Sequence, residues 1–184
     1  QGPTNHWALA ALIRLERLKA RQFAAPEEVI DLFRKYFATL HTARGDITLE
    51  LFADKAPLTV NNFVFLAQSG WYDGNTFYRV IPGLLAEAGD PTDTGLGGPG
   101  YYLPDEISLD LRYEGAGMVG MESAGPNTNG SRFFISLAAL PERNGRYTLF
   151  GKVISGTDVL AKLTPRDPDA NPEAAQGDRL YSVT

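Results

Sequence analysis

The chain has 184 residues, of which 43% are hydrophobic and 21% charged, a balance that suits one soluble domain with a sizeable core. Its net charge of −5 and its pI of about 5.0 argue against non-specific binding of nucleic acid. It contains no cysteine and only two histidines, so we expect no disulfide, no thiol chemistry, no histidine-rich metal site and no cofactor. No apolar run reaches the roughly 18 residues that a membrane span needs.

Residues 1–41 are predicted to form a helical extension. Apolar residues between Trp7 and Leu18 recur at three- and four-residue spacing, behind Thr4 as an N-cap. A second helix is expected to begin at Pro26, with an apolar face that extends to Leu40. Both helices need a partner surface, which is either the main domain or a neighbouring chain; a dedicated binding arm is the alternative.

The pattern changes near Gly45. Apolar residues from Ile47 to Leu51 alternate with polar ones, which predicts a half-buried strand. Pro57 is then expected to start a helix that Gly70 closes.

From Asn75 onward, short apolar runs alternate with turns. The runs are TFYRVI, GMVGM, RFFIS, YTLFGKVI and RLYSVT. One further helix is expected over Asp158 to Leu163, and the polar segment 166–178 is expected to be a surface loop. Many short strands with few helices favour an all-β barrel or sandwich with capping helices.

Five segments resemble, in order, the signature stretches of the cyclophilins, a family of peptidyl-prolyl cis-trans isomerases. They are RGDITLELFADKAPLTVNNFVFLAQSGWYDG, FYRVIPG, AGDPTDTGLGGPGYYLPDE, GPNTNGSRFFIS and TLFGKVISGTDVL. The resemblance is to a divergent, bacterial-like member and covers residues 42–184. It implies a mainly β fold, an eight-stranded antiparallel barrel capped by two helices, with the binding groove on its outer face. We therefore predict two regions, a helical extension over 1–41 and an isomerase domain over 42–184.

The chemistry of this reaction needs neither a nucleophile nor a metal. Rotation about a peptide bond meets a barrier of about 18–20 kcal/mol, because the nitrogen lone pair is delocalised into the carbonyl. A catalyst needs a donor aimed at the twisted prolyl amide and an apolar socket for the ring. Arg79 suits the donor role, since a guanidinium is permanently charged and carries several donors. The alternative for Arg79 is a barrel arginine that pairs with an acid for stability.

The socket is expected at the adjacent phenylalanines. If they lie on a strand, Phe133 and Phe134 point to opposite faces, so one enters the core and the other faces the groove. The resemblance assigns the groove to Phe134; the alternative is that both simply pack. The resemblance also implies that Arg79 is catalytic and that a larger set binds substrate. That set is Phe134, Leu84, Leu85, Glu87, Glu122, Ser123, Arg132, Arg143 and Tyr147.

Several of these positions depart from the family pattern. Leu84 and Leu85 replace a usual phenylalanine and methionine, and Glu87 replaces the glutamine that usually orients the arginine. Arg143 stands where leucine is usual, and Glu122 where alanine is common. We therefore expect a less aromatic socket and weak binding of cyclosporin-type ligands. The sequence does not decide whether Glu87 orients the Arg79 side chain or holds it in an inhibitory ion pair.

Two functions follow as hypotheses. The first is a prolyl isomerase that acts on proline-containing segments of client proteins, with an altered pocket and reduced activity. The second is a non-catalytic module that binds proline peptides or serves as a scaffold. No oligomeric state is predicted. Because the chain begins at Gln1 and lacks cysteine, we expect an exported or cell-envelope protein, with a trimmed cytoplasmic one as the alternative.

Overall fold

Eight strands and two helices form the described part of the chain. The structure is a computed structural model, and it describes residues 12, 16, 22–171 and 174–184. In chain order the elements are β1 (Tyr36–Thr42), β2 (Gly45–Leu51), α2 (Pro57–Gln68), β3 (Arg79–Ile81), β4 (Leu85–Ala88), β5 (Met118–Met121), β6 (Phe133–Ser136), the 3-10 turn η1 (Pro141–Arg143), β7 (Leu149–Ser155), α3 (Thr157–Leu160) and β8 (Leu180–Val183).

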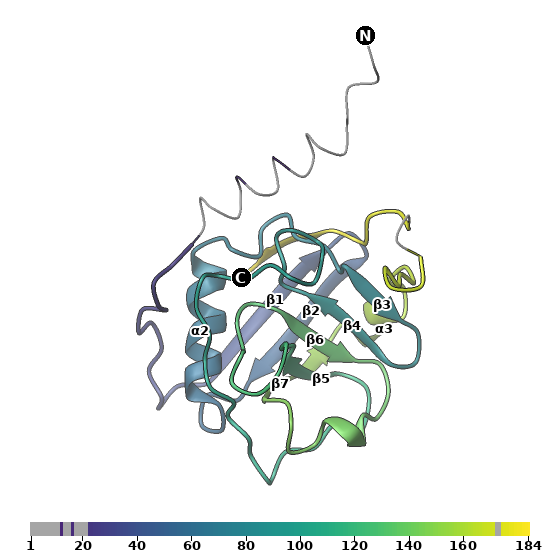
Figure 1. Cartoon of the computed structure of the whole chain (residues 1–184). Helices are drawn as coiled ribbons and strands as arrows, with labels where there is room; N and C mark the ends of the chain where they lie inside the picture. Colours follow the sequence, from purple (N-terminus) through teal and green to yellow (C-terminus); the bar gives the residue numbers. More distant parts are fainter. Residues whose placement is uncertain (1–11, 13–15, 17–21, 172–173) are drawn as a thin grey trace.

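The strands form one curled antiparallel sheet in the order β3-β4-β6-β5-β7-β2-β1-β8. Its two ends meet through an isolated bridge between Thr76 and Arg179. Two further backbone bonds flank this bridge, since the Phe77 amide donates to Asp178 and the Leu180 amide to Asn75, both at 2.9 Å. Figure 1 shows the curled sheet with α2 lying along one side of it. The predicted mainly β, barrel-like fold is confirmed.

The inner face of the sheet and the buried side of α2 form the main core. The ring of Phe63 on α2 lies 5.5 Å from that of Phe133 on β6 and 5.4 Å from that of Phe150 on β7. The helix begins at Pro57 as predicted, because proline tolerates a first-turn position that has no amide bond to make. Gly70 follows its end with a left-handed φ of 66°, also as predicted.

The prediction of a second helix from Pro26 is wrong. Residues 22–35 have no regular structure apart from a turn, and Tyr36 onward is strand β1, paired with both β2 and β8. The segment lies along α2, where the Asn61 side chain accepts from the amide of Val29 at 2.8 Å and donates to the carbonyl of Glu27 at 2.8 Å. These side-chain bonds, and the sheet partners that follow, satisfy backbone groups that a helix would have satisfied internally.

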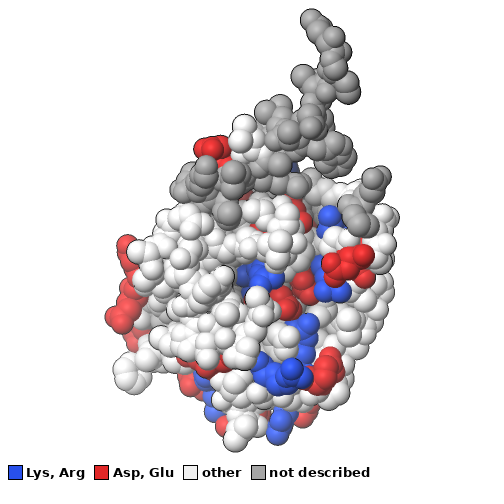
Figure 2. All heavy atoms as spheres, in the orientation of Figure 1, with Lys and Arg blue, Asp and Glu red and all other residues white. Residues whose placement is uncertain are grey.

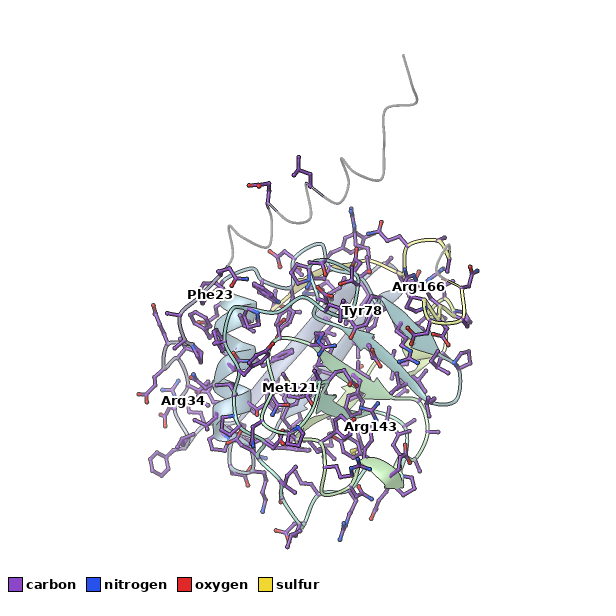
Figure 3. The ribbon with its side chains drawn as sticks, viewed as in Figure 1. Phe23, Arg34, Tyr78, Met121, Arg143 and Arg166 are labelled. Atoms are coloured by element: carbon purple, nitrogen blue, oxygen red, sulfur yellow. The ribbon has the colours of Figure 1, made fainter. Side chains whose placement is uncertain are left out.

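Strand β1 also crosses the position at which the chain was expected to divide. The division between residues 41 and 42 falls inside β1, so the sheet takes in part of the predicted extension. Phe23 reaches the core even earlier in the chain, with its ring 5.0 Å from that of Phe65 (Figure 3). The first predicted helix, from Thr4 to Leu18, lies outside the described residues apart from positions 12 and 16.

The C-terminal part follows the predictions in outline. The expected helix over Asp158 to Leu163 is shorter, since α3 spans only Thr157–Leu160. The polar segment that begins at Arg166 is a loop, as predicted, but Arg166 itself forms a bridge with Val80 of β3. This bridge brings the start of the loop against the strand that carries Arg79. Within the described residues, no helix is long and apolar enough to cross a membrane.

Candidate active site

A row of residues crosses the outer face of the sheet on four neighbouring strands. Arg79 on β3 lies opposite Glu87 on β4, and Glu87 lies opposite Phe134 on β6. Phe134 in turn lies opposite Gly120 on β5. Directly opposite residues of antiparallel strands share a face, and adjacent strands are about 4.8 Å apart. Register alone therefore places Arg79 and Phe134 on one surface, separated by about 10 Å.

The two adjacent phenylalanines point to opposite sides of β6, as predicted. Phe133 belongs to the main core, whereas Phe134 belongs to a second apolar cluster with Leu85 and Tyr113. The rings of Tyr113 and Phe134 are 5.4 Å apart. Gly120 leaves room for both, because a Cβ there would clash with the Tyr113 hydroxyl and with the Phe134 ring. Gly120 therefore shapes the floor of this cluster, a role that the sequence analysis missed.

Arg79 is held by three acidic side chains. Its Nη1 atom lies 3.7 Å from Glu87, its Nε 3.6 Å from Asp167 and its Nη2 3.4 Å from Asp169. Charge-assisted hydrogen bonds measure about 2.7–2.9 Å, so these are looser ion pairs. The buried Nε has no hydrogen-bond acceptor within the described part of the chain. Among the described residues the Nε donor of Arg79 is thus unsatisfied, while the charge of the guanidinium is balanced by Glu87 on one side and by Asp167 and Asp169 on the other.

Asp167 and Asp169 were not predicted as site residues. Both belong to the loop that begins at Arg166, which bonds to the β3 strand through its own backbone. The Arg166 guanidinium also donates to the Tyr78 carbonyl and, at 2.9 Å, to the Ala175 carbonyl. The closely spaced acids in RDPDAN were the available signal, but nothing local indicated that this loop would meet Arg79.

Glu87 sits in a crowded acidic environment and is almost fully buried. Burial first, and then the charge of Glu122, raises the pKa of the Glu87 carboxyl, while Tyr78, Arg79 and Arg143 act in the opposite direction. The neighbouring Tyr78 hydroxyl is buried without a hydrogen bond of ordinary geometry among the described residues. Burial and then the Glu87 charge raise the pKa of Tyr78 as well. Because its pKa is raised, Glu87 in the folded protein binds a proton more readily than an ordinary glutamate does.

Phe134 is closed off from solvent by an ion pair. The guanidinium carbon of Arg143 lies 4.3 Å from the centroid of the Phe134 ring and 4.3 Å from that of Tyr147. The two rings are 6.1 Å apart and nearly perpendicular, so the guanidinium lies in the corner between them. Arg143 Nη1 also donates to Glu122 at 2.8 Å. Figure 2 shows basic and acidic side chains interspersed across this face, and Arg143, labelled in Figure 3, is the last residue of the 3-10 turn η1.

The structure thus brings most of the predicted site residues together but leaves three outside this cluster. Leu84 lies 39% exposed in the turn between β3 and β4. Ser123 lines a separate hollow of about 310 Å³ whose rim includes Tyr147. Arg132 donates to the Gly95 carbonyl and lines another hollow, of about 430 Å³. Among the described residues no group of three or more His, Cys, Asp or Glu could hold a metal ion.

The sequence and the fold are similar to those of known proteins. The family model "Cyclophilin type peptidyl-prolyl cis-trans isomerase/CLD" matches residues 37–184. The chain therefore belongs to the cyclophilin-type peptidyl-prolyl cis-trans isomerase family. This places it in an enzyme class and disfavours the purely non-catalytic hypothesis.

Two curated relatives and one solved structure illustrate the likeness. A peptidyl-prolyl cis-trans isomerase of Schizosaccharomyces pombe is 48% identical over 127 residues, 67% of this chain and 82% of the relative. One of Arabidopsis thaliana is 50% identical over 125 residues, 66% of this chain and 78% of the relative. The crystal structure of a cyclophilin type isomerase of Cryptosporidium parvum has a TM-score of 0.76 at 37% identity, covering 82% of this chain and 97% of that chain. The same protein was also crystallised in the presence of the dipeptide Ala-Pro, and that structure has a TM-score of 0.74 and 36% identity.

Proposed function

We propose that Arg79 is the catalytic group for isomerisation of Xaa-Pro bonds in client proteins. The observation that carries this proposal is the row across β3, β4 and β6. It aligns a guanidinium that is held only by loose ion pairs with a phenylalanine on the same face. The strands that carry them are about 10 Å apart, and the long arginine side chain can extend across that gap toward the nitrogen of a proline ring held at Phe134.

The mechanism follows from the electronic structure of the amide. As the prolyl bond twists, the nitrogen lone pair withdraws from conjugation and becomes a better hydrogen-bond acceptor. A donor from Arg79 to that nitrogen stabilises the twisted state more than either planar state, and only such differential stabilisation speeds the reaction. Each 1.36 kcal/mol of it gives about a tenfold rate increase. Phe134 and Leu85 hold the ring while the rest of the peptide turns.

Glu87 is best understood as a loose electrostatic tether for Arg79. A separation of 3.7 Å is too long for a hydrogen bond, so Glu87 does not lock the guanidinium in one orientation. The arginine can then rotate toward a substrate at small cost. Of the two roles that the sequence left open, this favours the one in which Glu87 positions Arg79 over the one in which it holds Arg79 in an inhibitory ion pair.

The protein offers the backbone of a bound client one hydrogen-bonding site fewer than expected. The resemblance implied that both Glu122 and Ser123 bind substrate. The Glu122 amide already donates to the Arg132 carbonyl at 3.0 Å, so it is occupied. We therefore assign the pairing to Ser123.

The test is exchange NMR on a short Ala-Pro peptide with wild type and Arg79→Ala. A hydrogen bond to a charged group contributes about 1.5–3 kcal/mol, so kcat/KM should fall roughly ten- to a hundredfold. Arg34→Ala is the matched control, because Arg34 is exposed and pairs only loosely with Asp31 at 3.5 Å. Equal rates for Arg79→Ala, Arg34→Ala and wild type would remove Arg79 from the mechanism.

A further inference from the structure

The proline socket of the peptide-free protein is already filled. Phe134 has 0% exposure although it lies on the outer face of the sheet. Its neighbours Leu85 and Tyr113 are buried apolar or aromatic side chains, and Arg143 is the charged group that completes the cover. At 4.3 Å the guanidinium is in direct contact with the ring face, so no proline ring fits between them.

Arg143 can leave this position without a change in the fold. Its side chain is long and flexible, and 16% of it reaches solvent. Its departure would leave the Glu122 carboxylate, whose side chain is only 12% exposed, without its hydrogen-bonded partner. A charge left unpaired in such a site is costly, so opening the socket requires a replacement cation at Glu122.

We propose that Arg143 is a displaceable plug of the proline socket, and that a basic side chain of the client replaces it at Glu122. The inference rests on the proposed function, since it takes Phe134 as the base of the socket. It makes Glu122 and Arg143 determinants of substrate specificity. The substrate class is a proline preceded directly by lysine or arginine.

The position of Glu122 sets where the basic residue must be. Its Oε2 atom is 2.8 Å from the same guanidinium that lies over Phe134. A ring seated on Phe134 would therefore lie close to this carboxylate, within reach of the side chain of a neighbouring client residue. The residue next to proline is the one best placed to make that contact.

The charge of the open groove favours the same client. With Arg143 displaced, four carboxylates remain around the site, on Glu87, Glu122, Asp167 and Asp169. Among the described residues, Arg79 is then the cation that pairs with these acids, through Glu87, Asp167 and Asp169. Burial, and then the charge of Glu122, raises the pKa of Glu87, as expected for two carboxylates that lie close together. An acidic client residue would meet repulsion where a basic one is attracted.

The experiment compares three capped peptides, Ala-Lys-Pro-Phe, Ala-Ala-Pro-Phe and Ala-Glu-Pro-Phe, by exchange NMR at low salt. For wild type, kcat/KM should be about tenfold higher on the lysine peptide than on the glutamate peptide. Arg143→Leu should raise kcat/KM on the neutral peptide several-fold, because nothing must be displaced. Glu122→Gln should abolish the lysine preference. Arg112→Leu, which removes an exposed arginine, is the control and should behave as wild type.

A direct readout keeps the inference testable if a variant is unstable. In wild type, nuclear Overhauser contacts between the Arg143 side chain and the Phe134 ring should be present without peptide and lost with the lysine peptide. Contacts that persist in the saturated complex would overturn the inference, as would a wild type without charge preference or an Arg143→Leu variant slower on all three peptides. If Arg79→Ala keeps wild-type rates while the lysine preference holds, the catalytic assignment fails and the specificity inference stands.

Discussion

Asp167 and Asp169, the two aspartates beside Arg79, should lower the isomerisation rate. The change is the double variant Asp167→Asn/Asp169→Asn, which keeps side-chain size and removes both charges. The contacts are 3.6 and 3.4 Å long, and Asp169 is 77% exposed. Each ion pair therefore contributes only about 0.5 kcal/mol of interaction free energy, because solvent screens it. Together they contribute about 1 kcal/mol, which corresponds to about a fivefold change in rate. If substrate binding must break these pairs, the double variant should be about fivefold faster than wild type.

The assay is exchange NMR on a neutral Ala-Pro peptide, so that no client charge takes part. The gain should shrink at high salt, because exposed pairs are screened over a Debye length of about 8 Å at physiological ionic strength. The control variant Asp54→Asn/Asp110→Asn removes two exposed acids, one of which pairs with Lys55 at 3.3 Å. A double aspartate variant slower than wild type would refute the reasoning and show that the loop positions Arg79 rather than restraining it.

Two further predictions concern Glu87 and Gly120. Burial and Glu122 raise the pKa of Glu87 in the folded protein, so wild type should lose stability as pH rises from the ordinary glutamate value, about 4.3, through the raised value. Urea unfolding at several pH values should therefore show Glu87→Gln gaining stability relative to wild type over this range; a constant difference would contradict the prediction. Gly120→Ala should cost about 1–3 kcal/mol and reduce kcat/KM, because its Cβ overlaps the Phe134 ring. Gly115→Ala, whose Cβ meets open space, should change neither, and equal losses in both variants would refute the packing argument.

Much of the candidate site could be predicted because its residues sit in recognisable segments. Arg79 and Phe134 were identified through the resemblance of FYRVIPG and GPNTNGSRFFIS to one family. The alternation of Phe133 and Phe134 followed from strand geometry alone. The row from Arg79 through Glu87 to Phe134 could not be predicted in this way, since it depends on the register of three strands.

The contacts of the charged residues were outside the reach of sequence reasoning. Glu122 and Arg143 were both recognised as departures from the family pattern. The structure pairs them with each other, at 2.8 Å. The partners that Arg79 gains beyond Glu87 come from a loop about ninety residues further along the chain.

The sequence by itself determined the features that are local. The helix from Pro57 to Gln68 and the inward alternation from Ile47 to Leu51 follow from backbone preferences and from side-chain periodicity, which act over a few residues. Tertiary structure decided that the segment before Thr42 is a strand, because its apolar residues suit a helical face as well as the inner side of a sheet, and β2 and β8 supplied the missing hydrogen-bond partners. It also decided that Arg143 covers Phe134, because that contact exists only when β5, β6 and the turn after β6 are folded against one another.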